Sequence, residues 1–211
     1  MSATTDHAAA RAAGLRRGRT LEYLTIGWNM LEGVIAVGSG LAAGSAALIG
    51  FGVDSFIESL SGGALLWRLR SDEDSERRER IALKLVGVSF LGLAAYVAYD
   101  AASSLIRGEP PEASYVGIAL AALSLVVMPL LARAKRRVAA GLNSRALEAD
   151  SRQTDICAYL SAVLLGGLLL NALFGWWWAD PVAALVMVPI IGKEGVEALR
   201  GETCCDEGAC H

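Results

Sequence analysis

Histidine is nearly absent from this chain, and charged residues are sparse. Only His7 and His211 occur among the 211 residues, and both lie in terminal tails. Because neither histidine can serve as a base beside the acidic residues discussed below, an enzyme is not expected. Charged residues form 19% of the chain and apolar residues 54%, whereas soluble domains carry about a quarter charged residues. This composition excludes an ordinary soluble domain.

Cysteine is also scarce, and its positions limit its role. One of the four cysteines, Cys157, lies in a long apolar run, and the other three stand near the C-terminal end. A reducing compartment argues against structural disulfides, so these thiols are expected to be free or to bind metal. The tail lacks the paired C-x-x-C spacing of a structural zinc site. Its residues that could capture a metal are Cys204, Cys205, Cys210 and His211.

Six long apolar runs dominate the rest of the chain. A membrane-spanning helix needs roughly 17 to 25 mostly apolar residues, and each run is about that long. The runs cover residues 21–41, 45–67, 81–106, 114–132, 146–174 and 181–199. We therefore predict an all-α membrane protein with six transmembrane helices. Its transmembrane domain covers residues 21–200, between tails of residues 1–20 and 201–211.

Basic residues are segregated to one side of this predicted topology. Of the 19 Lys and Arg residues, only Arg107 falls in a link on the opposite side. The positive-inside rule then predicts that both termini are cytoplasmic. The basic clusters, including the one with Lys135 and Arg136, stand at membrane edges and are mixed with acidic residues, so no nucleic-acid partner is expected. The expected location is a bacterial plasma (inner) membrane, crossed several times.

An acidic pair stands inside the second apolar run. Asp54 and Glu58 are one helical turn apart, so both carboxylates lie on one helix face. Charged groups at membrane depth cost a few kcal/mol each on insertion scales, and such residues usually mark an ion pathway. Two hard oxygen donors held together resemble half of a cation site.

A short internal repeat indicates the other half of that site. The second and fifth runs open on the same pattern, S-x-A-L, at Ser45 and Ser144. Asp54 and Glu58 follow the first serine by nine and thirteen residues, and Gln153 and Cys157 follow the second in the same way. Transporters built from repeats place their sites near the midplane between such segments.

A second face of the fifth run offers different ligands. Ser151 and Asp155 form another pair four residues apart, and Glu148 shares a stripe with Asp155. Gln153 and Cys157 lie roughly 200° around the helix from that stripe. Depth in the membrane favours Gln153 and Cys157, but Asp155 is the stronger type of ligand, so both faces stay open.

Two polar residues in the first run are further candidates. Asn29 and Glu32 stand three residues apart at membrane depth. They could line a pathway or act as metal ligands. The interpretation that we favour is that they support the carboxylates of the second run.

These motifs resemble the transmembrane part of the cation diffusion facilitator family. The resemblance covers about residues 20–200 and is carried by residues 44–48 and 54–58 in the second run and by residues 144–150 in the fifth. Asn29 and the Asp180-Pro181 pair that opens the sixth run also fit. Family members have six helices and a four-residue metal site, with a pair four apart from each of helices two and five. The resemblance implies Asp54, Glu58, Gln153 and Cys157 as metal ligands.

The chain departs from the family pattern at three places. Gln153 and Cys157 replace the usual His or Asp pair, Glu58 stands where Asp is commoner, and a short tail follows the sixth run where the family has a cytoplasmic metal-binding domain. A set of oxygen and thiolate ligands disfavours Mg²⁺ and Ca²⁺ and suits Zn²⁺, Cd²⁺, Co²⁺ or Fe²⁺.

The resemblance implies a secondary transporter that exports a divalent metal, zinc first, in exchange for protons. Metal binding requires deprotonated ligands, so exchange with protons follows from the site itself. The metal is the cargo, and no cofactor is expected. The resemblance also implies a homodimer. The alternative is a membrane metal sensor or partner subunit that moves nothing.

Overall fold

The computed structural model describes residues 2–68, 75–108, 111–142 and 144–200, and these residues form six α-helices and no strand. The prediction of an all-α protein with six helices is confirmed. The helices are α1 (Ser2–Ala43), α2 (Ala46–Arg68), α3 (Ser75–Arg107), α4 (Tyr115–Leu142), α5 (Arg145–Phe174) and α6 (Ala179–Arg200).

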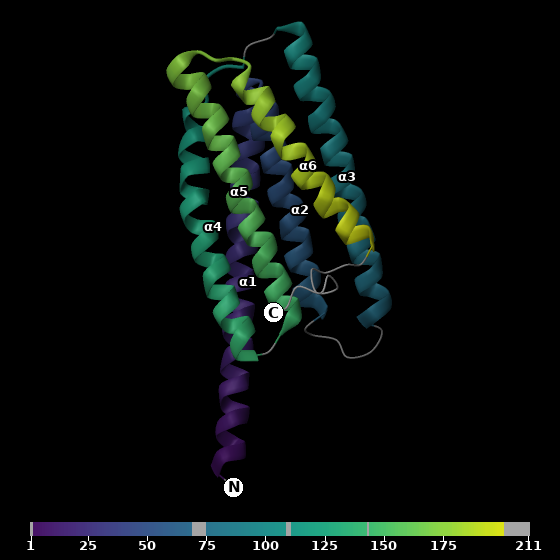
Figure 1. The fold of residues 1–211 in the computed structure, drawn as a ribbon. Coiled ribbons are helices and arrows are strands. Elements are labelled where there is room, and N and C mark those ends of the chain that lie inside the picture. The colour runs from purple at the N-terminus through teal and green to yellow at the C-terminus, as the bar shows by residue number, and fades with distance from the viewer. Residues whose placement is uncertain (1, 69–74, 109–110, 143, 201–211) are drawn as a thin grey trace, which may run out of the picture.

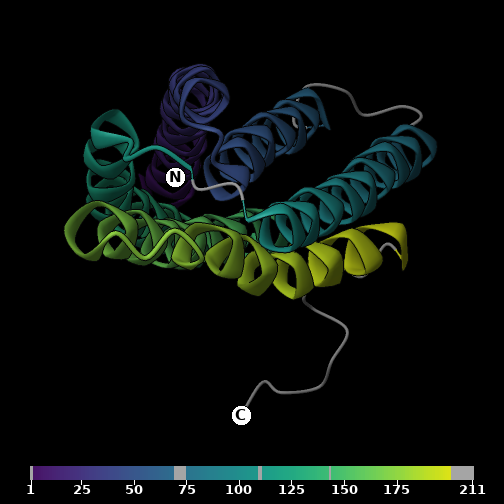
Figure 2. The ribbon, with the colours of Figure 1, turned by 90° about the horizontal axis from the view of Figure 1, so that it is seen from above.

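The helices form an antiparallel bundle with α2 at its centre (Figure 1). α2 packs against α1, α3, α5 and α6, while α4 packs against α1 and α5. Figure 2 shows α3 and α6 together at one side of the bundle and α1 and α4 at the other. α3 and α6 approach closely because glycines face each other: a Cβ atom on Gly87 would lie 2.8 Å from the carbonyl oxygen of Gly195.

Four of the six helices in the described part of the chain contain a stretch long and apolar enough to cross a membrane. These stretches are Ala12–Ala43, Gly87–Arg107, Tyr115–Leu142 and Asp150–Phe174. The other two helices, α2 and α6, have acidic residues in their interior, among them Asp54 in α2 and Glu194 in α6. These two helices pack against each other.

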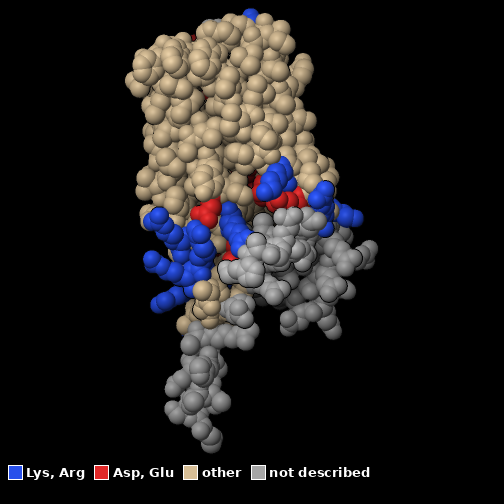
Figure 3. Space-filling view, viewed as in Figure 1, with Lys and Arg blue, Asp and Glu red and all other residues tan. Residues whose placement is uncertain are grey.

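α1 is much longer than the apolar run that predicts it. It has 42 residues and starts at Ser2, so the helix continues through the segment expected as a separate tail. At about 1.5 Å per residue, such a helix is roughly twice as long as the ~30 Å hydrocarbon core of a bilayer. Its N-terminal part extends beyond the other helices (Figure 1). Lys and Arg side chains gather at the same end of the bundle (Figure 3).

Serine side chains cap the two helices that begin with S-x-A-L. Ser45 Oγ accepts a hydrogen bond from the backbone N–H of Leu48 at 3.1 Å, and Ser144 Oγ accepts one from Leu147 at 3.5 Å. These caps satisfy amide groups that the first helical turn leaves without a partner. Gly44 precedes the first cap with a φ of 66°, a left-handed conformation that favours glycine. The repeat is thus a helix-start signal.

Asp180 connects the start of α6 to the start of α2. It lies in the first turn of α6, yet its Oδ1 accepts a hydrogen bond of 2.6 Å from Ser45 Oγ. The backbone amides of Ala46 and Ala47 also lie against its carboxylate. Asp180 therefore stabilises the start of α2 from a neighbouring helix, because an anionic side chain is favourable at a helix N-terminus.

Candidate metal site

The two serine caps bring the predicted ligand pairs to the same depth. α2 and α5 run in opposite directions (Figure 1), and each pair stands nine and thirteen residues beyond its capping serine. At about 1.5 Å per residue, the pairs lie roughly 14 to 20 Å from opposite ends of the bundle. Because α2 and α5 start at opposite ends of the bundle, equal distances along the two helices bring both ligand pairs near the middle of the molecule.

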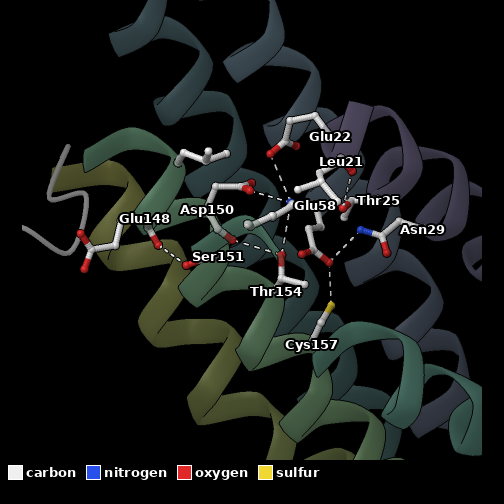
Figure 4. Close-up of polar contacts among 12 residues, drawn as sticks. Leu21, Glu22, Thr25, Asn29, Glu58, Glu148, Asp150, Ser151, Thr154 and Cys157 are labelled. Atoms are coloured by element: carbon white, nitrogen blue, oxygen red, sulfur yellow. Dashed lines mark hydrogen bonds and ion pairs between the residues drawn. The ribbon is translucent and has the colours of Figure 1, made fainter. Parts of the chain in front are cut away.

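Cys157 joins the two acids of α2 from the facing helix. Its Sγ donates a hydrogen bond to Glu58 Oε2 at 2.7 Å and lies 3.8 Å from Asp54 Oδ2. All three side chains are buried. Figure 4 shows Glu58 between Cys157 on one side and Asn29 on the other. The structure thus brings together three of the four predicted ligands.

Gln153, the fourth predicted ligand, lines the same small cavity. The cavity lies among α2, α3, α5 and α6 and has a volume of about 10 Å³, close to the lower limit for one water molecule. Its polar lining consists of Asp54, Glu58, Gln153, Cys157 and Glu194. Glu194 of α6 is not among the residues predicted from sequence. Its place beside Lys193, near the end of the sixth apolar run, carries no spacing signal that links it to the site.

The competing face of α5 points elsewhere. Asp155 forms an ion pair of 2.9 Å with Arg136 of α4, and both side chains are partly exposed. Glu148 pairs with Arg152 on the surface, and Ser151 Oγ donates its hydrogen bond to the carbonyl oxygen of Glu148. None of these three residues lines the cavity. Of the two faces that the sequence left open, the one with Gln153 and Cys157 is the one that meets α2.

Residues of α1 support the acids without joining the cavity lining. Asn29 Nδ2 donates a hydrogen bond of 2.8 Å to Glu58 Oε2. Ser55 of α2 makes a 3.1 Å hydrogen bond with Glu32 Oε2. Asn29 and Glu32 are both fully buried. Their position agrees with a supporting role, since groups that orient ligands are a regular part of metal sites.

A buried ionic cluster next to the site was not predicted. Lys135 of α4 is fully buried and pairs with Glu22 of α1 at 3.2 Å and with Asp150 of α5 at 2.5 Å. Its Nζ also lies 3.4 Å from Thr154 Oγ1. The sequence places Lys135 in a basic cluster at a membrane edge but does not show that its side chain is buried. The long lysine side chain turns inward because two carboxylates on neighbouring helices compensate its charge.

The side chains of the candidate site are hydrogen-bonded to one another through a thiol proton and are not placed around a common point where a metal ion could bind. Among the described residues, no three His, Cys, Asp or Glu side chains form a ready metal centre. The thiol of Cys157 instead donates its hydrogen to Glu58, where a metal ligand must present a lone pair. A divalent cation would have to displace that proton and draw Asp54, Glu58 and Cys157 around itself.

The cysteines and histidine of the C-terminal tail lie outside the described residues. Cys204, Cys205, Cys210 and His211 remain candidates for metal capture from the sequence alone.

Comparison with known proteins identifies the family. The model of the cation efflux transmembrane domain matches residues 25–202. The chain belongs to the cation efflux family. This match includes α2 to α6, the second half of α1 and both halves of the candidate site, and it confirms the resemblance seen in the sequence. Members of this family are transporters, which confirms the expectation that the chain is not an enzyme.

Individual relatives are distant and longer than this chain. It is 26% identical over 166 residues to the cation-efflux pump FieF of Shewanella oneidensis, covering 74% of this chain and 56% of the relative. It is 30% identical over 179 residues to an uncharacterized transporter of Methanocaldococcus jannaschii, covering 81% and 63%. Transmembrane protein 163 of Xenopus laevis is 25% identical over 182 residues, with coverage of 85% and 65%. The chain thus spans 56 to 65% of the length of these relatives.

Proposed function

We propose that this chain is a secondary transporter that moves a divalent transition-metal cation, zinc first, across a membrane in exchange for protons. The site is Asp54, Glu58, Gln153 and Cys157, and access to it alternates between the two sides as α2 and α5 move against the rest of the bundle. One observation carries the proposal: a thiol on α5 lies against two buried carboxylates on α2.

The donor set supports a transition metal as the cargo. Two carboxylates and a thiolate supply three negative charges, and the Gln153 side chain adds a neutral carbonyl oxygen. A soft sulfur ligand selects Zn²⁺, Cd²⁺, Co²⁺ or Fe²⁺ over Mg²⁺ and Ca²⁺. The name of the pump from Shewanella oneidensis points in the same direction, because it describes cation efflux.

The hydrogen bonding of the site supports exchange with protons. Buried carboxyl and thiol groups keep their protons in the absence of a cation, since an isolated buried charge is costly. Metal binding releases these protons, and metal release lets them return. No separate route for the driving ion is needed.

Reconstitution into liposomes tests transport directly. With the purified chain in vesicles that contain a zinc-sensitive dye, we expect zinc uptake to accelerate when the vesicle interior is made more acidic than the outside. Protons should leave the vesicles as zinc enters. Zinc binding in detergent without any flux in vesicles would contradict transport and favour a metal sensor or a partner subunit.

Replacement of the thiol should change which metal is preferred. In Cys157→Ser we expect the preference for Cd²⁺ over Mn²⁺ to fall by about tenfold or more, because serine offers no soft anionic ligand. Competition binding of the two metals measures the ratio. Cys157→Asp restores the charge with a hard oxygen, so it should recover zinc affinity but not the cadmium preference. An unchanged ratio in both variants would remove Cys157 from the site.

The assembly and location follow from the proposed transport. We propose a homodimer that is held by its helices, in a bacterial plasma membrane with both termini in the cytoplasm. The collection of Lys and Arg at one end of the bundle supports this orientation (Figure 3).

A further inference from the structure

Glu32 is a buried carboxyl group in a pocket of neutral hydrogen-bonding side chains. It is fully buried, and its Oε1 has no hydrogen-bond partner in the described part of the chain. Trp28, Ser55 and Ser124 surround it from α1, α2 and α4. The indole Nε1 of Trp28 and the hydroxyl oxygen of Ser124 are also buried without a partner among the described residues. A buried group with unpartnered atoms calls for an explanation.

The hydrogen bonds of Ser55 are best satisfied when Glu32 carries a proton. Ser55 Oγ lies 3.1 Å from Glu32 Oε2 and also 3.1 Å from the carbonyl oxygen of Phe51. A serine hydroxyl has one hydrogen, and a carbonyl oxygen can only accept. An ionised Glu32 would share the single Ser55 hydrogen with the carbonyl oxygen of Phe51, whereas a protonated Glu32 can donate to Ser55 Oγ and give each contact its own hydrogen.

The charges that face Glu32 agree with a protonated carboxyl group. α1 packs against α2 and α4. From α2, the carboxyl groups of Glu58 and Asp54 face Glu32, and neither can supply a positive charge. Cys157 reaches toward it from α5, and the α4 group at its side is the neutral Ser124. Lys135 of α4 faces Glu58 and is paired with Glu22 and Asp150.

The same pocket can stabilise Glu32 after the proton has left. The unpartnered N–H of Trp28 and O–H of Ser124 lie beside the carboxyl group and can donate to a carboxylate. Hydrogen bonds to a charged acceptor are roughly twice as strong as those between neutral groups. The pocket therefore offers partners to both protonation states, as a site for reversible proton binding requires.

We propose that Glu32 is a proton-binding site of the transporter, separate from the metal ligands, and that its proton leaves when the metal binds. The inference rests on the proposed transport function. Zinc binding at Asp54 and Glu58 would shift the part of α2 that carries Ser55, which takes the Ser55 hydroxyl away from Glu32 and favours loss of the Glu32 proton. The products of this step are a carboxylate on Glu32 and one proton released to water.

Two contacts between α1 and α2 connect Glu32 to the metal site. Asn29 of α1 is hydrogen-bonded to Glu58 of α2. One turn later in α1, Glu32 is hydrogen-bonded to Ser55, the residue directly after Asp54. A shift of α2 during alternating access would change both contacts together. A movement of α2 would thus change the surroundings of Glu32 and favour loss of its proton.

The number of protons released per zinc ion tests the inference. We expect calorimetric titration of the purified full chain with Zn²⁺, in buffers of different ionisation enthalpy, to show about one fewer proton released in Glu32→Gln than in the unmodified protein. The increase of zinc affinity with pH should become less steep by about one log unit of affinity per pH unit, because the slope equals the number of protons released. Glu148→Gln is the matched control, since Glu148 is half-exposed and far from the pocket, and it should leave the count unchanged.

With Glu32→Gln, either of two results would overturn the inference. One is an unchanged proton count in a Glu32→Gln variant that still binds zinc. The other is a loss of zinc affinity as large as that of Asp54→Asn at every pH, which would make Glu32 a ligand. If Glu32→Gln does not fold, Ser124→Ala is the second variant, because it removes a hydroxyl that can donate to the Glu32 carboxylate. Proton release should then occur at higher pH. Release at an unchanged pH would overturn the inference. The number of protons released per zinc ion is measured at binding equilibrium and does not require transport. Zinc binding without flux would therefore contradict the proposed function, and the proton count would still test the role of Glu32.

Discussion

Asp54→Asn is expected to abolish metal transport while the helical bundle stays folded. The change keeps the shape of the side chain and removes an anionic ligand from a buried site. Loss of a supporting residue typically lowers metal affinity 10- to 100-fold, so loss of a direct ligand should lower zinc affinity by more than about 100-fold. The midpoint temperature of thermal unfolding should be unchanged or higher, because the substitution removes a buried acid that has no salt bridge. Calorimetric binding and vesicle flux measure the first effect, and thermal unfolding in detergent measures the second.

Asp155→Asn is the matched control for this substitution. The same change is made on α5, at the acid that pairs with Arg136 outside the cavity. Zinc affinity and flux should stay near those of the unmodified protein. If Asp155→Asn lost transport and Asp54→Asn kept it, the metal would bind at the other face of α5 and the proposed site would be wrong.

Lys135→Met is expected to destabilise the bundle strongly. The change removes the buried cation that pairs with Glu22 and Asp150 and leaves both carboxylates without it. Breaking a buried ion pair by removal of one partner costs about 3–5 kcal/mol in free energy of unfolding. Because the pairs connect α1, α4 and α5, thermal or denaturant unfolding should show the loss for the whole bundle.

Arg136→Met provides the comparison at the next residue. Arg136 makes an ion pair of similar length with Asp155, but its side chain is half-exposed. A surface pair contributes about 0–1 kcal/mol, so its loss should change the free energy of unfolding by no more than that. Equal effects of the two substitutions would mean that Lys135 is wetted rather than buried.

Much of this arrangement could be predicted because it depends on local sequence. Six apolar runs predict six helices, and serine caps with ligands nine and thirteen residues later predict which residues of α2 and α5 face each other. The choice between the two faces of α5 was harder, since Asp155 is the stronger ligand by chemistry. Arg136 on a neighbouring helix decides it, because the ion pair draws Asp155 away from α2.

Other features depend on contacts between helices and could not be read from the sequence. The burial of Lys135 requires Glu22, which lies more than a hundred residues earlier in the chain. The position of Glu194 requires the tilt and close packing of α6 against its neighbours. The extension of α1 to Ser2 also escaped the apolar pattern, because hydrophobicity marks where a helix meets lipid rather than where it begins.

The capped starts of α2 and α5 have a consequence for how metal preference can change. Residue counts from Ser45 and Ser144 fix the angle and height at which four side chains meet, so one inserted residue in either interval would rotate its pair by about 100°. Exchange of the side chains at these positions leaves that frame untouched. In the proposed transporter, helix register would therefore set where the ion binds, and the side chains at residues 153 and 157 would set which ion is preferred.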